Sequence, residues 1–212
     1  PDWVWFSQRN NTSSKLLFDS SRGVNKALYS NTNIAETDSN QYGYLSVFGD
    51  DGFTAQAGSS NNNYINENNI NIVAWNWLAN GGTTTTNDAS STGVGSIDSV
   101  IQANTTAGFS IVDYTGTGAT GTIAHGLGAK PEVILVKGRD DGHAWIVGHT
   151  NSGAGFDVLV LNATDAASNG ASEFNDTVPT SSVFTVKSAG GTNKDGEKYI
   201  AYCFAEKQGF SR

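Results

Sequence analysis

The chain has 212 residues, of which 37% are hydrophobic and only 15% are charged, and its formal net charge is −8. An ordinary soluble domain has about 25% charged residues, so polarity here comes mainly from Asn, Ser, Thr and the 25 glycines. These residues favour tight turns and disfavour helices, which indicates an all-β fold. The negative charge argues against nucleic acid and against an anionic membrane surface as partners. No apolar run approaches the ~18 residues that cross a membrane, so we expect no membrane insertion.

Short runs rich in Val, Ile, Tyr, Phe, Trp and Thr, bounded by turn residues, predict β-strands throughout the chain. In the first part they lie near residues 2–8, 15–19, 26–30, 44–48, 52–56 and 70–78. In the second part they lie near residues 96–103, 108–114, 121–124, 132–138, 144–149, 157–161, 182–187 and 198–205. Several runs are apolar at every position, so both faces of these strands are expected to be covered. The spacing of the turns favours a β-sandwich of jelly-roll type.

The second part of the chain repeats the pattern of the first. Four anchors recur in the same order, at offsets of 127 to 131 positions. They are PDWVWFSQR (1–9) with PEVILVKGR (131–139), Asn31 with Asn162, Phe53 with Phe184, and IVAWNWLA (72–79) with YIAYCFAE (199–206). Because order and spacing are both kept, we predict an internal repeat.

The repeat predicts two related β-sandwich modules, over residues 1–82 and 96–212. Residues 83–95 are rich in Gly, Thr and Ser and contain no large apolar residue before Val94, which indicates a linker. Three additional strands precede the repeated part of the second module, and the first module has no counterpart to them. Its opening strands are therefore expected to be missing. Strand 1–8 would then have an open flank, to be covered by an upstream segment, a partner chain or the other module.

No motif in the sequence predicts catalysis, so we expect a protein that is not an enzyme. The single cysteine, Cys203, excludes an internal disulfide and lies in an apolar strand, as a buried structural thiol would. Two carboxylate pairs, Asp50/Asp51 and Asp140/Asp141, lie beside glycines, where turn formation explains them. A polysaccharide-degrading enzyme would also use two carboxylates, and this stays the weakest alternative.

The histidines predict no metal site. His143 lies next to Asp140 and Asp141, but the sequence shows no third ligand, so we expect neither a metal nor another cofactor. His125 stands in the motif AHGLG, between a strand and a glycine turn. We interpret it as a turn histidine that is hydrogen-bonded to the backbone.

Tryptophans occur in two alternating pairs, and we interpret them as core residues. Aromatic rings of this kind also serve as sugar-binding platforms, which is the alternative interpretation. At the repeat anchors Trp3, Trp5, Trp75 and Trp77 align with Val133, Leu135, Tyr202 and Phe204, all of which are apolar or aromatic. Residues outside the anchors are better candidates for receptor contact. Those candidates are Tyr42, Tyr44, Tyr64 and His143.

Two long motifs resemble known virion repeats. GFSIVDYTGTG (108–118) with GTIAHGLGAKPEVILVKGRDD (121–141) resembles a repeat in tail-fibre-like structural proteins of tailed bacteriophages, especially marine phages. PDWVWFSQRN with VAWNWLANGG, within 1–82, resembles the sister repeat of the same proteins. The resemblance covers nearly the whole chain, and its motifs are structural rather than catalytic.

The resemblance implies a component of the virion, an extracellular particle, that assembles with other virion proteins. It also implies a homo-oligomer, with a trimer favoured for a fibre. The expected function is a tail-fibre or tail module that presents a host-attachment surface to a bacterial surface glycan or protein receptor. A capsid decoration or head-fibre protein and a lectin-like carbohydrate-binding module remain as alternatives.

Overall fold

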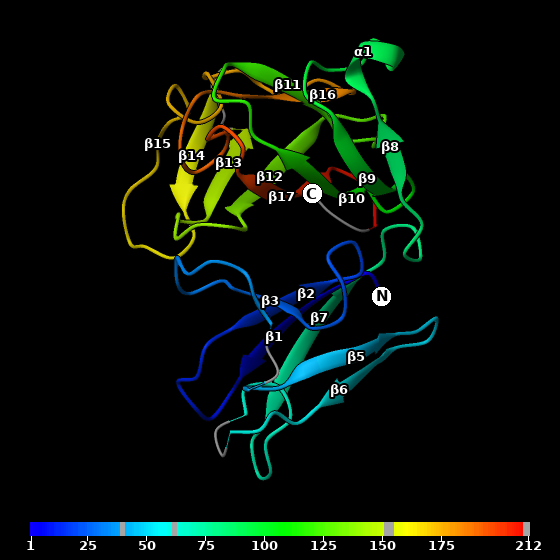
Figure 1. Cartoon of the computed structure of the whole chain (residues 1–212), viewed down its shortest axis with the longest axis vertical. Coiled ribbons are helices and arrows are strands. Elements are labelled where there is room, and N and C mark those ends of the chain that lie inside the picture. Colours follow the sequence, from blue (N-terminus) through cyan, green and yellow to red (C-terminus); the bar gives the residue numbers. More distant parts are fainter. Residues whose placement is uncertain (39–40, 61–62, 151–154, 210–212) are drawn as a thin grey trace.

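The computed structural model describes residues 1–38, 41–60, 63–150 and 155–209. Antiparallel strands make up nearly all of the regular structure in this part of the chain (Figure 1). The prediction of an all-β, sandwich-like fold is confirmed. The described residues include one short helix, α1 (Ala89–Thr92). None of the described helical structure is long and apolar enough to span a membrane.

The first module contains a five-stranded sheet and a hairpin. The sheet has the order β4-β3-β2-β1-β7. Its strands are β1 (Trp3–Gln8), β2 (Leu16–Asp19), β3 (Lys26–Tyr29), β4 (Thr37–Asp38) and β7 (Ile72–Trp77). The hairpin consists of β5 (Tyr44–Phe48) and β6 (Phe53–Gln56).

The second module contains an eight-stranded sheet and a separate strand pair. The sheet has the order β15-β14-β13-β12-β17-β10-β9-β8. Its strands are β8 (Thr85–Asn87), β9 (Ser99–Asn104), β10 (Phe109–Thr115), β12 (Pro131–Gly138), β13 (Ile146–Thr150), β14 (Phe156–Val160), β15 (Ser168–Asn169) and β17 (Lys198–Ala205). The strand pair consists of β11 (Gly121–Ala124) and β16 (Val183–Val186).

Three apolar cores separate four layers, which follow one another along the long axis of the molecule (Figure 1). One core lies between the β5–β6 hairpin and the five-stranded sheet, and includes Phe6 and Leu45. The middle core lies between the two large sheets, where Trp3 meets Tyr202. The third lies between the eight-stranded sheet and the β11–β16 pair. Since the middle core draws residues from both modules, the modules pack face to face rather than as separate bodies.

The two large sheets share features that an internal repeat requires. The order β4-β3-β2-β1-β7 corresponds to β15-β14-β13-β12-β17. The register corresponds as well, because the pair Phe6 and Ala74 matches the pair Val136 and Ala201. The repeat stays a prediction, and these shared features support it.

The aligned asparagines make the same contact in both modules. The side-chain oxygen of Asn31 accepts a hydrogen bond from the backbone of Lys15 at 2.9 Å. The side-chain oxygen of Asn162 accepts one from the backbone of Trp145, also at 2.9 Å. In each case the asparagine closes a β-hairpin at its open end. An Asn anchor therefore has a structural reason to recur in both halves of the sequence.

Residues 83–95, which the sequence predicts as a linker, are part of the second module. They contain β8 and α1, and β8 pairs with β9 at the end of the eight-stranded sheet. Asp88 caps α1 by accepting a hydrogen bond from the backbone of Ser91, and Gly93 ends the helix in the left-handed conformation at φ 68°. Short polar residues therefore serve as caps and an edge strand here, which composition alone does not distinguish from a linker.

The prediction that strand 1–8 has an open flank is also wrong. β1 lies inside the five-stranded sheet, with β2 on one side and β7 on the other. On the β7 side of β1 the sheet ends at β7, because among the described strands only β1 pairs with it. In the eight-stranded sheet the corresponding strand, β17, has β12 on one side and β10 on the other.

Candidate functional site

The unequal width of the two sheets produces a cleft beside β7. The five-stranded sheet ends at β7, whereas the eight-stranded sheet continues beyond β17 through β10, β9 and β8. The cleft has a volume of about 400 Å³. It is lined by Asn76, Trp77, Leu78, Asn104, Thr106, Ala107, Phe109 and Phe204. We call this the β7 cleft.

Three aromatic rings form the apolar part of the β7 cleft. The ring centroid of Phe204 lies 6.1 Å from that of Trp77 and 5.0 Å from that of Phe109. Behind them the indole of Trp3 is fully buried, with its centroid 4.5 Å from that of Trp77 and 4.6 Å from that of Tyr202. The rings at the surface are therefore held by a packed aromatic layer beneath them.

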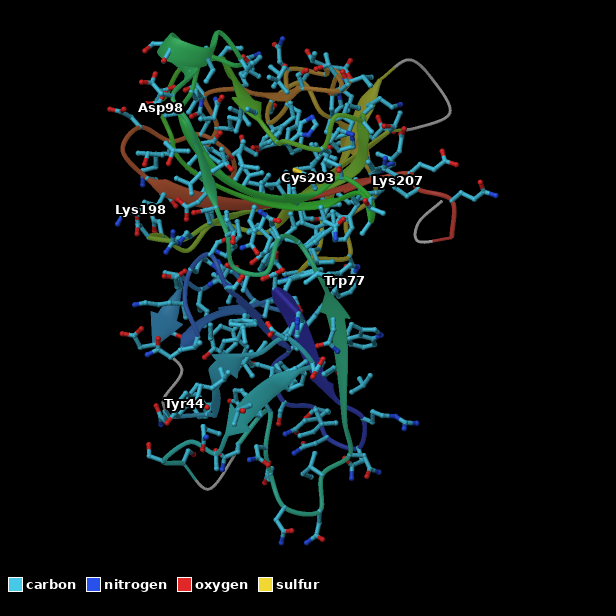
Figure 2. The ribbon with its side chains drawn as sticks, turned by 90° about the vertical axis from the view of Figure 1, so that its right-hand side faces the viewer. Tyr44, Trp77, Asp98, Lys198, Cys203 and Lys207 are labelled. Carbon is cyan, nitrogen blue, oxygen red and sulfur yellow. The ribbon has the colours of Figure 1, made fainter. Side chains whose placement is uncertain are left out.

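Strand alternation explains why this layer faces the second module. In a β-strand, side chains two positions apart lie on the same face. Trp3 pairs with Trp77 and Trp5 pairs with Trp75, so all four indoles lie on one face of the sheet. That face packs against the eight-stranded sheet, and Trp77 lies where β7 approaches it (Figure 2).

The rim of the β7 cleft is polar but uncharged. Leu78, directly after β7, is 54% exposed. Its backbone oxygen accepts a hydrogen bond from Nδ2 of Asn104 at 3.1 Å, which joins the two sides of the cleft. Asn76 and Thr106 supply the other side-chain donors and acceptors. None of the described residues that line the cleft carries a charge, so the cleft suits a neutral ligand with both apolar and hydroxyl groups.

Comparison with protein families gave a match to the whole chain. A domain of unknown function, DUF7483, matches residues 1–212. The chain belongs to this family. Neither the curated proteins nor the solved structures yielded a match. The DUF7483 match treats both modules as one unit, and its description names no activity.

The structure places the candidate receptor contacts of this DUF7483 domain in two separate regions. Tyr42 and Tyr64 stack in the first module, with ring centroids 4.6 Å apart and an interplanar angle of 3°. Tyr44 lies on β5 and packs half-buried against the first-module core (Figure 2). His143 lies in the second module, beside Asp141 and Glu197. None of these four residues lines the β7 cleft.

The core interpretation of the tryptophans holds for some of them only. Trp3 is buried, and Trp5 and Trp77 pack partly buried against the middle core. Trp75, in contrast, is 46% exposed. Its aligned counterpart Tyr202 is covered because Trp3 and Trp145 stack on it and β10 lies beside β17, whereas no described strand takes that place beside β7. Residues 1–82 contain no counterpart of the three strands that precede the repeated part of the second module, and this was the sequence signal for the exposure.

Three residues of types that can act in catalysis make contacts typical of structural residues. Burial raises the pKa of the Cys203 thiol to about 12, which keeps it protonated at neutral pH. His125 is buried, with its Nδ1 accepting from the backbone of Leu127 and its Nε2 lying 3.2 Å from the backbone oxygen of Thr180. A carboxylate oxygen of Asp140 accepts from the backbone of Lys198 at 3.0 Å. These contacts agree with a structural thiol, a turn histidine and a turn carboxylate.

Proposed function

We propose that this protein is a non-enzymatic component of a bacteriophage virion, a tail-fibre or tail module that attaches to the host through the β7 cleft. The observation that carries the proposal is the uncharged aromatic cleft between β7 and the wider sheet. The resemblance of the two repeats to tail-fibre-like proteins supports a virion setting. The ligand we propose is a neutral bacterial surface glycan.

The chemistry of the β7 cleft fits a sugar better than an ion or a lipid chain. The C–H faces of a sugar ring pack on aromatic rings, which Trp77, Phe109 and Phe204 supply. Sugar hydroxyls need neighbouring donors and acceptors, which the side chains of Asn76 and Thr106 supply. Ligand sites commonly combine a mostly apolar lining with a few polar groups in volumes of about 300–1,000 Å³.

A glycan array tests the proposal with a matched pair of variants. Leu78→Asp places a charge at the rim of the cleft on a side chain that is already exposed, so folding should be kept. Val47→Asp makes the same kind of change on β5, where the valine is 48% exposed and lines none of the described pockets near β7. We expect the wild type and Val47→Asp to bind the same neutral glycans and Leu78→Asp to lose them. Silence of the wild type across bacterial glycans, or unchanged binding by Leu78→Asp, would refute the role of the cleft.

A second candidate function is assembly through the open edge of β7. An exposed strand edge offers unpaired backbone groups to another strand, and β1 is the sole described strand that pairs with β7. The partner would be another copy of the chain or another virion protein, in a tail fibre, a capsid decoration or a head fibre. Light scattering tests self-assembly, for which the fibre proposal expects a trimer and a monomer would count against it. Mass spectrometry of purified virions distinguishes the tail from the head.

A further inference from the structure

A compact group of ligand-type side chains lies outside the β7 cleft, where the loop after β12 meets the start of β17. It consists of Asp141, His143 and Glu197, and one ligand atom from each lies within 4.8 Å of the others. Nε2 of His143 is 3.4 Å from Oε2 of Glu197 and 3.7 Å from Oδ2 of Asp141. Lys198, the first residue of β17, marks this end of the sheet in Figure 2.

The buried carboxylate of Glu197 lacks the contacts that such a group needs. Its side chain is only 4% exposed, and no hydrogen bond from the described residues reaches either oxygen. Nε2 of His143 is also buried, and no described residue forms a hydrogen bond with it. A buried charged group without hydrogen bonds is costly, and a bound ion is one of the usual ways to compensate it. Both unsatisfied groups belong to the same three-residue cluster.

Two lysines supply part of the missing positive charge. Nζ of Lys194 lies 2.7 Å from Oδ2 of Asp141, but 3.8 Å from Oε2 of Glu197, which is beyond hydrogen-bond range. The Lys194 side chain is 51% exposed and can move into solvent. Nζ of the buried Lys137 donates to the backbone oxygens of Gly138 and Asp141, at 2.7 and 3.3 Å. Neither ammonium therefore contacts both Nε2 of His143 and the carboxylate of Glu197, as a bound metal ion would.

Glycines on two sides make room for the cluster. A Cβ atom on Gly190 would lie 2.7 Å from Cε1 of His143, so a larger residue would displace the imidazole. A Cβ atom on Gly138 would collide with Oε1 of Glu197. The backbone thus lies close to the Glu197 side chain at Gly138 of β12 and close to the His143 side chain at Gly190, in the turn after β16. These contacts limit where the two side chains can lie.

We propose that Asp141, His143 and Glu197 form a zinc site. In a tetrahedral site with ligand bonds of about 2.0–2.1 Å, neighbouring ligand atoms lie about 3.3 Å apart. The separations of 3.4 and 3.7 Å from Nε2 of His143 are close to that value. One imidazole and two carboxylates are ligands that Zn²⁺ accepts, and a water molecule would complete the site. The ion would take the place of the Lys194 ammonium and tie the loop after β12 to the start of β17.

Zinc titration of tag-free protein, in competition with a chromophoric chelator, tests this proposal. We expect one zinc ion per chain and a rise in the unfolding temperature at saturating zinc. His143→Ala and Glu197→Gln should each weaken binding by more than about 100-fold, since each removes a ligand. Lys194→Met should strengthen binding, because it removes a competing cation and leaves all three ligands in place. A variant that binds zinc more tightly must be folded, so this result cannot be explained by a loss of folding.

Two control variants and a second metal complete the design. His149→Ala removes a histidine of β13, and Asp195→Asn removes an exposed carboxylate from the turn next to Glu197; both should bind zinc like the wild type. The proposal is overturned if the wild type binds no stoichiometric zinc, or if zinc binding survives His143→Ala unchanged. Ca²⁺ binding as tight as zinc binding would also overturn it, because a Ca²⁺ site needs six or more oxygen ligands.

Discussion

Replacement of Arg22 by Met tests how strongly the molecule depends on one buried charge near the contact between its modules. The side chains of Arg22 and Asp19 are both 0% exposed and form an ion pair. Arg22 also donates to Oε2 of Glu36 and to the backbone oxygen of Lys26, both at 3.0 Å. From the second module, the hydroxyl of Tyr202 donates to Asp19 at 2.6 Å.

The expected loss of stability in Arg22→Met depends on which hydrogen bonds the carboxylates of Asp19 and Glu36 keep. Loss of one partner from a buried ion pair costs about 3–5 kcal/mol, mainly because the other charge is left uncompensated. Glu36 keeps two hydrogen bonds from Arg139, at 3.0 and 3.1 Å. Asp19 keeps the Tyr202 hydroxyl and one backbone amide. We therefore expect a loss near the lower end, about 3 kcal/mol.

Urea unfolding of a double-mutant cycle measures this cost. Asp19→Asn in the Arg22→Met background removes the stranded charge, so the double variant should be more stable than the sum of the two single losses by about 1–3 kcal/mol. The exposed pair of Lys26 and Asp38, with side chains 38% and 57% exposed, serves as the matched control and should contribute less than about 1 kcal/mol. Additive losses at Asp19 and Arg22, or a cost for Arg22→Met as small as that of the control pair, would refute the reasoning.

Three further predictions concern buried side chains. Burial lowers the pKa of His125 below its ordinary 6.5, so below that pH the unfolded chain binds more protons than the folded chain. The free energy of unfolding should then fall as the pH drops from about 6.5, and fall less in His125→Asn, when urea unfolding is measured at several pH values. Since burial raises the pKa of Cys203 to about 12, the native chain at pH 8 should not react with a thiol reagent, whereas the urea-unfolded chain should react fully. Trp3→Ala should cost about 3–5 kcal/mol in urea unfolding, and Trp75→Ala much less, because Trp75 is half exposed.

The sequence predicted most strands correctly, because their apolar residues follow a regular pattern along the chain. Each predicted strand has a counterpart whose ends lie within about three residues of the prediction. The strands that the pattern missed are β4, β8 and β15, which have only two or three residues each. All three lie at the ends of sheets and consist of Thr, Asp, Ser and Asn. Residues of this kind also build turns, so local composition could not separate an edge strand from a loop.

The cluster at His143 shows the limit of reasoning from local spacing. Asp141 and His143 are near neighbours in sequence, and the expectation of no metal site rested on the lack of a third ligand. Glu197 is more than fifty positions away, and it arrives because β12 pairs with β17, which sets Gly138 opposite Tyr199. The two segments were already identified as repeat anchors. Only their pairing as neighbours in one sheet, which the anchors do not specify, would have revealed the third ligand.

Comparison of the five-stranded sheet with the eight-stranded sheet explains why the edge of β7 is open. Trp75 aligns with Tyr202, and Tyr202 is buried because Trp3 and Trp145 stack on it and Ile111 of β10 lies beside it. Among the described strands nothing plays the part of β10 beside β7, so Trp75 and Leu78 stay exposed and the β7 cleft remains open. A strand added there would cover the aromatic rings that we propose for glycan binding. Attachment through the cleft and assembly through the edge therefore exclude each other on the same copy of the chain, and oligomers that cover β7 should not bind the glycan.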